Sequence, residues 1–231
     1  NRVLVDHLSS KLFAPTRTAV ENLAREGLGA ELTHLVGDVM YDTVRHFGPV
    51  SERRTRVLED LGLSPNGYVL ATVHRAENTD DPKRLTTIVD ELVALAESLP
   101  VVFPLHPRTR KLLEAGGALE KVLAALVVTD PLGYLEMMAL ERNAAVIATD
   151  SGGVQKEAYF HEVPCVTLRD ETEWTELVAT GWNRLCPPVE GAPIARTVLA
   201  AVGTRGSDEE LYGHGDAAEK IVEIVTRGAA R

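Results

Sequence analysis

The sequence predicts an α/β protein built around a doubly wound parallel sheet. Short apolar, β-branched segments alternate with amphipathic segments along most of the 231 residues. Such alternation is typical of parallel strands whose two faces are covered by helices. Five or six strands are expected between residues 68 and 185, each followed by a helix. That number makes one complete Rossmann-like domain.

The first fifty residues predict two strands and several helical segments, too few for a domain of their own. Helices are expected at 3–12, 17–26 and 40–47, with strands at 12–14 and 32–36. Pro49 and Ser51 predict a break before a further helix at 52–61. We interpret residues 1–50 as the C-terminal remnant of a preceding Rossmann-like domain. Because the chain has no initiator Met, we expect it to begin partway through a longer protein.

Residues 51–207 predict the complete domain, and residues 208–231 a closing segment. The expected strands are 68–73, 101–105, 126–128, 144–149 and 165–168. The expected helices are 82–99, 108–115, 119–123, 134–142, 154–160 and 173–180. A last helix at 208–227 carries an apolar stripe of Leu211, Ala218, Ile221, Val222 and Val225.

Composition and charge exclude several classes of function. The formal net charge of −10 opposes non-specific nucleic-acid binding, although a local cluster of donors can still bind a nucleotide. The apolar runs are too short to span a membrane, and no signal peptide is recognisable. The only cysteines, Cys165 and Cys186, lack metal-ligand spacing and are expected to be buried thiols of a cytoplasmic protein. No metal site, Walker motif or nucleophile elbow is present in the sequence.

The strongest local signal is the segment 149–158, TDSGGVQKEA. It follows an apolar strand and opens a helix, where free N–H groups and the helix dipole favour a phosphate. Ser151 adds a hydroxyl, while Gly152 and Gly153 let a ligand approach the backbone. Glu157 follows Gly153 by one helical turn and is placed to accept hydrogen bonds from ribose hydroxyls. The alternative is an ordinary strand-to-helix turn.

Further polar loops follow neighbouring strands. Residues 72–78, TVHRAEN, offer His74 and Arg75 to a phosphate, or form a solvated loop with an internal Arg75–Glu77 pair. His106 lies between prolines, where a rigid helix start is the simpler interpretation. Residues 130–137 include Met137, whose side chain either packs against a nucleotide base or belongs to the core. Residues 169–176 carry four acids at a helix start, where acids commonly pair with the dipole.

The shared position of these polar loops favours a ligand site over the separate alternatives given for each. Each of these polar loops follows a predicted strand of the sheet. The carboxyl ends of parallel strands share one edge, and ligands of such folds bind at that edge.

Taken in order, the motifs resemble those of the UDP-N-acetylglucosamine 2-epimerases. They run NR…DH, FAPT, NL…EG, VGD, HRxEN, HP, GYL, TDSGGxQxEA and RxxTE, from residue 1 to residue 182. The resemblance implies a glycosyltransferase-B-like fold with UDP in its cleft and most of the N-terminal domain missing here. It also implies that the closing helix crosses back to that first domain, and that the protein is a homodimer serving cell-envelope polysaccharide biosynthesis.

The resemblance also implies the roles of individual residues. His74, Ser151 and the Gly152–Gly153 amides would contact the diphosphate, Glu157 the ribose and Met137 the uracil. In some bacterial relatives, positions matching Arg75 and His106 bind a second substrate molecule as activator. Here Ala76 and the His106-Pro107-Arg108 run depart from that pattern, which argues against activation. Trp174 replaces a usual arginine and resembles a subgroup.

The reaction implied by the resemblance interconverts UDP-N-acetylglucosamine and UDP-N-acetylmannosamine by elimination and re-addition of UDP, without a cofactor. His74 would stabilise the leaving group. The acid and base carboxylates would come from the N-terminal domain, so this chain alone is expected to be inactive. Two alternatives stay open: a hydrolysing epimerase that gives UDP and N-acetylmannosamine, and a non-catalytic module that binds UDP-sugars.

Overall fold

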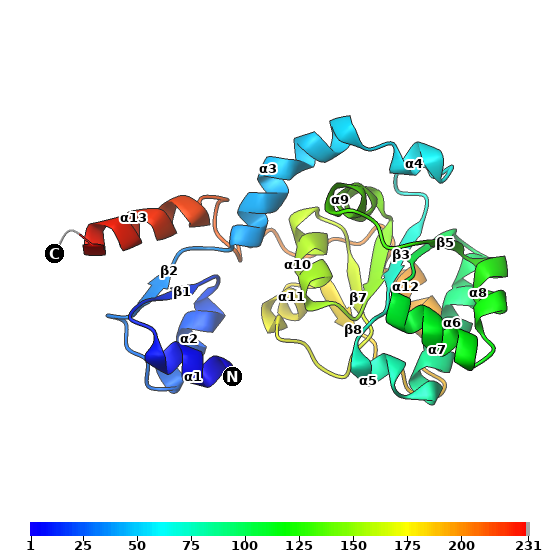
Figure 1. The fold of residues 1–231 in the computed structure, drawn as a ribbon, viewed down its shortest axis with the longest axis horizontal. Helices are drawn as coiled ribbons and strands as arrows, with labels where there is room; N and C mark the ends of the chain where they lie inside the picture. The colour runs from blue at the N-terminus through cyan, green and yellow to red at the C-terminus, as the bar shows by residue number, and fades with distance from the viewer. Residues whose placement is uncertain (230–231) are drawn as a thin grey trace. The chain divides into compact units, whose positions relative to one another are not determined.

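The structure, a computed structural model, describes residues 1–229 and divides into two compact units (Figure 1). Unit 1 contains Asn1–Phe47 together with the chain from Asp208 onward. Unit 2 contains Gly48–Ser207. Helix α3 (Val39–Arg54) begins in the first and ends in the second.

Unit 1 contains two parallel strands and several helices. Its other elements are α1 (Arg2–Leu8), β1 (Leu12–Ala14), α2 (Arg17–Arg25), β2 (Thr33–Leu35) and α13 (Ala217–Ala229). The strands pair with Leu12 opposite Thr33. The Thr16 hydroxyl accepts a hydrogen bond from the Ala19 N–H and caps α2. The first helix is shorter than predicted, because the chain leaves the helix at Ser9 in extended conformation.

The predicted closing helix at 208–227 is wrong in its first half. Helix α13 begins at Ala217, after Gly213 and Gly215 adopt positive φ angles of 79° and 80°. Such angles interrupt a right-handed helix, and glycine adopts them without steric cost. The Asp42 carboxylate then accepts hydrogen bonds from the Ala217 and Ala218 N–H groups at 3.2 and 2.7 Å. This cap fixes the start of the helix.

The predicted break at Pro49 is also wrong, because α3 continues through it to Arg54. A proline inside a helix removes one hydrogen bond and is usually disruptive. Contacts within unit 2 hold the second half of α3 in place. The buried Ser51 hydroxyl donates to the Leu135 carbonyl at 2.6 Å, and Glu52 pairs with Arg142 at 2.6 Å. The expected helix at 52–61 is replaced by the end of α3 and the short α4 (Val57–Asp60).

Unit 2 contains a six-stranded parallel sheet in the order β5-β4-β3-β6-β7-β8. The strands are β3 (Val69–Thr72), β4 (Val101–Pro104), β5 (Val127–Thr129), β6 (Val146–Thr149), β7 (Cys165–Thr167) and β8 (Asn183–Leu185). Chain order runs outward from β3 to β5, then returns to β6 and runs outward to β8. Such a sheet has its topological switch point between β3 and β6.

Helices cover both faces of this sheet (Figure 1). Those that follow the strands are α5 (Ala76–Thr79), α6 (Pro82–Ala96), α7 (Pro107–Ala115), α8 (Leu119–Ala125), α9 (Tyr134–Asn143), α10 (Gly152–Phe160), α11 (Thr175–Ala179) and α12 (Ile194–Ala201). Two of them, α5 and α12, fall outside the predicted set. The helices predicted between residues 82 and 180 and the predicted strands of this unit are confirmed, with ends shifted by a few residues.

Alternate strand residues build two separate cores, as the two-residue repeat of a strand requires. Val69 and Ala71 join a core with α6, α8 and α12. Tyr68 and Leu70 join the other core, with α9 and α10. Both predicted buried thiols are confirmed, and burial raises the pKa of Cys165 to about 12. The doubly wound arrangement predicted from the sequence is therefore present.

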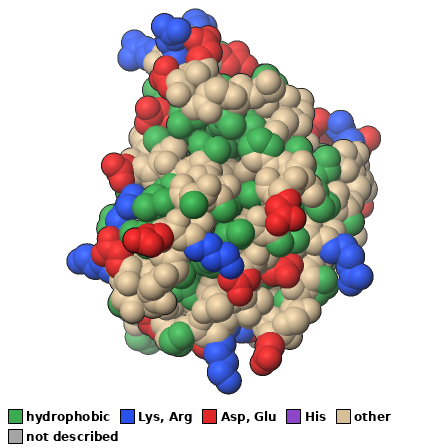
Figure 2. All heavy atoms as spheres, turned by 90° about the vertical axis from the view of Figure 1, so that its right-hand side faces the viewer, with side chains coloured by type: hydrophobic (Ala, Val, Ile, Leu, Met, Phe, Trp, Pro, Cys, Tyr) green, Lys and Arg blue, Asp and Glu red, His purple; other side chains and the backbone are tan. Residues whose placement is uncertain are grey.

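The surface carries charges of both signs. On the face drawn in Figure 2, acidic and basic side chains are dispersed among hydrophobic ones. The acidic excess of the sequence therefore does not form one continuous negative patch on that face. Among the described helices, none has the length and apolar character needed to cross a membrane.

Candidate functional site

Two strand ends, 77 residues apart in sequence, lie side by side at the switch point of unit 2. Thr72 and Thr149 are register partners, and their hydroxyl oxygens are 2.5 Å apart. The chain leaving β3 carries His74 and Arg75, and the chain leaving β6 carries the Ser-Gly-Gly turn. The structure therefore brings together the two strongest predicted motifs, residues 72–78 and residues 149–158.

Asp150 holds these two loops together. Its side chain is fully buried and accepts hydrogen bonds from the backbone N–H groups of His74 and Arg75 at 3.0–3.1 Å. The Asn78 amide donates to it at 3.1 Å and also donates to the Leu168 carbonyl at 2.9 Å. A buried carboxylate with several donors is strongly oriented, because each unmade bond would carry a desolvation cost.

His74 stands beside this carboxylate. Its Nδ1 lies 3.4 Å from the Asp150 Oδ1, and 41% of its side chain is exposed. The His106 ring lies 5.8 Å away, centroid to centroid. An imidazole accessible from solvent is thus presented at the edge where ligands bind.

The Ser-Gly-Gly turn opens helix α10. The Ser151 hydroxyl caps the helix by accepting from the Val154 N–H at 3.4 Å, and the Ser151 N–H donates to the Thr149 hydroxyl at 2.9 Å. Gly152 and Gly153 are the first two helical residues. Amides in those positions have no acceptor within the helix and point out of its N-terminus. This geometry suits an anion.

Glu157, one turn further along α10, lies in a mostly buried acidic cluster. Burial raises its pKa, while Lys156 and a hydrogen bond from Tyr134 act in the opposite direction. Glu141 of α9 is 3% exposed, and its pKa is raised well above the usual value by burial and by the charge of Glu157. The charge of Glu157 thus disfavours ionisation of Glu141.

The other predicted site residues, Arg75 and His106, make contacts outside the Ser-Gly-Gly turn. Arg75 donates to Glu173 at 3.2 Å, and Glu173 also accepts from Arg169 at 2.7 Å. Arg75 is therefore engaged by an acid of the loop after β7. His106 caps helix α7, its Nδ1 accepting from the Arg108 N–H at 3.2 Å.

Met137 packs against the core on the α9 and α10 side and is partly exposed. It follows Tyr134 by three helical positions and so lies on the same face of α9. Since Tyr134 forms a hydrogen bond with Glu157, Met137 is on the side of α9 that faces Glu157 of α10.

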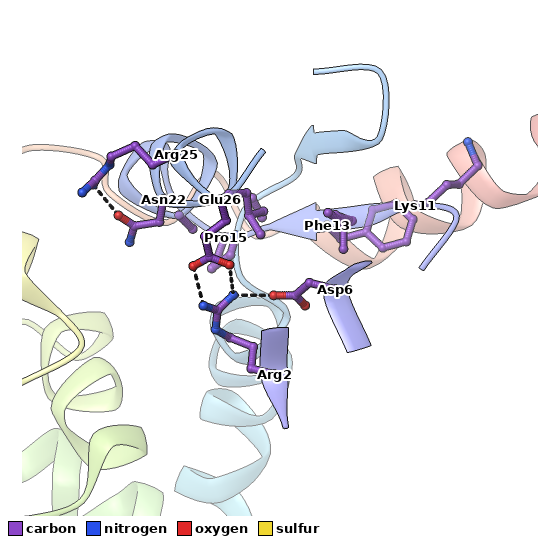
Figure 3. A pocket seen from close by; sticks show the side chains of 12 residues that line it. Arg2, Asp6, Lys11, Phe13, Pro15, Asn22, Arg25 and Glu26 are labelled. Atoms are coloured by element: carbon purple, nitrogen blue, oxygen red, sulfur yellow. Dashed lines mark hydrogen bonds and ion pairs between the residues drawn. The ribbon is translucent and has the colours of Figure 1, made fainter. Parts of the chain in front are cut away.

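A hollow lies in unit 1. It has a volume of about 600 Å³ and is bordered by α1, β1 and α2 (Figure 3). Arg2 bonds there to both Asp6 and Glu26, and its hydrogen bond lowers the pKa of Glu26. The charges of Arg2, Asp6 and Glu26 are thus already paired with each other. None of the predicted site residues lies in it.

Several residues of the site carry no predicted role in the sequence. In the sequence, Asp150 and Asn78 cannot be distinguished from solvated loop residues. Tyr134 and Glu141 cannot be distinguished from ordinary helix residues. The only available signal is that Asp150 and Asn78 fall inside motifs that end two strands. Their partnership depends on the adjacency of β3 and β6, which only the folded sheet reveals.

A doubly wound sheet with an anion-binding turn at its switch point is the architecture of nucleotide-binding domains. The family model described as UDP-N-acetylglucosamine 2-epimerase matches residues 1–226. The chain belongs to that family, and its fold is glycosyltransferase-B-like, as predicted.

Individual relatives agree with this assignment. A UDP-N-acetylglucosamine 2-epimerase homolog of Methanococcus maripaludis is 45% identical over 97% of this chain and 63% of its own. The UDP-2,3-diacetamido-2,3-dideoxy-D-glucuronate 2-epimerase of Pseudomonas aeruginosa is 46% identical over 98% of this chain and 62% of its own. The Methanocaldococcus jannaschii UDP-GlcNAc 2-epimerase, crystallised with UDP-GlcNAc and UDP, has a TM-score of 0.89 at 38% identity. That match covers 98% of this chain and 64% of the other. The chain thus spans about 63% of the length of the relatives it matches.

Proposed function

We propose that this chain is the UDP-binding part of a UDP-N-acetylglucosamine 2-epimerase. The observation that carries the proposal is the convergence of His74, the Ser151–Gly153 turn and Glu157 at the switch point of the sheet. Family membership and the ligands of the M. jannaschii structure support it.

In the proposed complex the diphosphate lies at the start of α10. The Gly152 and Gly153 amides and the Ser151 hydroxyl donate to it, and the His74 ring, which lies beside Asp150, adds a further N–H donor. Glu157 accepts hydrogen bonds from the ribose hydroxyls, and Met137 lies against the uracil. Arg75 and His106 stand beside the diphosphate as additional contacts.

The proposed reaction depends on these contacts with UDP. The C2 proton of the sugar is barely acidic, because C1 is an acetal and not a carbonyl. Removing that proton while the C1–O bond breaks gives 2-acetamidoglucal and UDP. UDP then adds back at C1, and a proton reaches the opposite face of C2. Donors that hold the departing diphosphate stabilise the charge that develops on it, and the same contacts keep UDP in place for its return.

The acid and base at C2 are a separate requirement. We propose that they belong to the part of the relatives that this chain does not span, so the 231-residue chain binds UDP without turning over the sugar nucleotide. The reaction itself needs no redox cofactor or metal in this scheme. A cytoplasmic location, a homodimeric assembly and a role in envelope polysaccharide synthesis complete the proposal.

A second candidate substrate follows from the comparisons. The 46% identity to an enzyme named for UDP-2,3-diacetamido-2,3-dideoxy-D-glucuronate favours a diacetamido uronic acid as the sugar. Both candidates carry UDP, so the proposed UDP contacts serve either one. Turnover of the two sugar nucleotides by a protein extended to the length of its relatives distinguishes them. NMR of the products also distinguishes a hydrolysing epimerase, which releases free N-acetylmannosamine.

Calorimetric titration with UDP tests the proposed site. Glu157→Gln removes the charge that would accept from the ribose, and we expect about a tenfold loss of UDP affinity. The affinity for 2′,3′-dideoxy-UDP should be the same in both proteins. Glu120→Gln, an exposed position on α8, is the matched control. The proposal fails if the unsubstituted chain binds no UDP. An equal loss for both ligands would refute the ribose contact.

A further inference from the structure

The loop that follows β7 places an indole against the first turn of α10. The Trp174 Nε1 donates to the Gly152 carbonyl at 2.8 Å. If Gly152 carried a Cβ atom, that atom would lie 3.4 Å from this nitrogen and 3.6 Å from the Arg75 Nη2. Trp174 and Arg75 therefore flank the first residue of the helix.

This hydrogen bond acts on the amide of the next residue. A trans peptide is a rigid plane in which the carbonyl of one residue and the N–H of the next point in opposite directions. An anchor on the Gly152 carbonyl therefore fixes the direction of the Gly153 N–H, away from Trp174 and out of the helix end. Two successive glycines have more backbone freedom than any other pair, so an external anchor has a large effect here.

The indole is itself held from two sides. The Lys156 ammonium lies 4.4 Å from the centroid of the Trp174 ring, and Lys156 is only 7% exposed. A buried cation over an indole face is a favourable contact.

The Thr172 hydroxyl fixes the loop that carries the indole. It donates to the Gln155 side-chain oxygen at 2.6 Å and accepts from the Trp174 N–H at 3.2 Å. The loop and the first turns of α10 are thus joined at several points.

We propose that Trp174, supported by Lys156, is a positioning residue that orients the Gly152–Gly153 peptide for a nucleoside diphosphate. This role rests on the proposed function, since it concerns the same turn. Trp174 would therefore strengthen the binding of the diphosphate group of UDP. The binding of the uridine group would depend on other residues.

The second tryptophan of the chain supplies a matched control. Trp182 also donates its indole N–H to a backbone carbonyl, that of Ser207, at 2.9 Å. It also has a cation over its ring, with the Arg205 guanidinium 5.7 Å from the centroid. Phenylalanine at either position keeps a ring and removes the N–H donor. Only the Trp174 bond reaches the helix start.

The test compares UDP with uridine in calorimetric and NMR titrations of the 231-residue chain. Trp174→Phe should lower UDP affinity about fivefold, with uridine affinity unchanged. Lys156→Met should lower it about twofold, and Trp182→Phe should change neither. Equal losses for UDP and uridine would mean a structural role and overturn the assignment. So would an unchanged UDP affinity in Trp174→Phe.

Fluorescence decides the matter if Trp174→Phe does not fold. The sequence has two tryptophans, so Trp174 is the only indole in Trp182→Phe. Its emission should change on saturation with UDP and not with uridine. Emission indifferent to bound UDP would overturn the positioning role alone. Failure of the unsubstituted chain to bind UDP would instead refute the nucleotide site, and the positioning role with it.

Discussion

Two charged clusters of this molecule, one in each unit, differ in how firmly they are built. In unit 1 Arg2 bonds to Asp6 and Glu26 with 58% of its side chain exposed. In unit 2 the fully buried Asp150 accepts from two backbone amides and from Asn78. Water competes for the first set of bonds and not for the second. Burial, and not the number of ion pairs, therefore decides which cluster orients its neighbours.

The largest effect should come from removing the buried carboxylate. Asp150→Ala leaves three donors without their acceptor, and we expect the free energy of unfolding of unit 2 to fall by about 3 kcal/mol or more. Both tryptophans lie in unit 2, so urea denaturation followed by tryptophan fluorescence measures this unit. The same substitution at Asp130, whose side chain is 88% exposed in its pair with Arg110, should change little. Equal effects at the two positions would contradict the comparison.

A smaller effect of opposite sign is expected at Glu141. Folding raises the pKa of this carboxyl through burial and the nearby Glu157 charge, so the folded state holds its proton to higher pH than the unfolded chain. Stability therefore declines as pH rises above about 4.5. Glu141→Gln should flatten this decline and raise the free energy of unfolding at pH 8 by about 1 kcal/mol.

Urea denaturation from pH 5 to pH 8 measures the Glu141 effect. In Glu141→Gln the free energy of unfolding should still decline somewhat with rising pH, because the pKa of Glu157 is also raised. Glu120→Gln, on the exposed side of α8, should leave the parent profile intact. A Glu141→Gln profile parallel to that of the parent would mean that this carboxyl does not titrate as proposed.

The smallest effect should come from the exposed cluster. Arg2→Ala removes both of its ion pairs, yet we expect no resolvable change in amide exchange over residues 2–26, because solvated pairs contribute little. Raising the salt concentration should abolish any difference that remains. Strong loss of protection in α1 and α2 would show that this cluster holds unit 1 together after all.

The fold of unit 2 was largely predictable because its signals are local. Strand periodicity, start signals such as Pro82 and the apolar faces of the helices placed most elements within a few residues. The errors lie where distant contacts override local preference. Pro49 stays inside α3 because Ser51 and Glu52 are held by residues more than eighty positions away. The late start of α13 depends on capping by Asp42, far upstream.

The sequence by itself determined the class of fold, the family and the motifs that end each strand, since strand periodicity and helix capping are short-range properties. Tertiary structure alone decided that β3 lies beside β6, that Asp150 joins their loops, and that Trp174 rests on Gly152. Those contacts join residues that lie between 22 and 77 positions apart. The physical reason is that a carboxylate or an indole N–H acquires fixed partners only when folding limits the access of water to it.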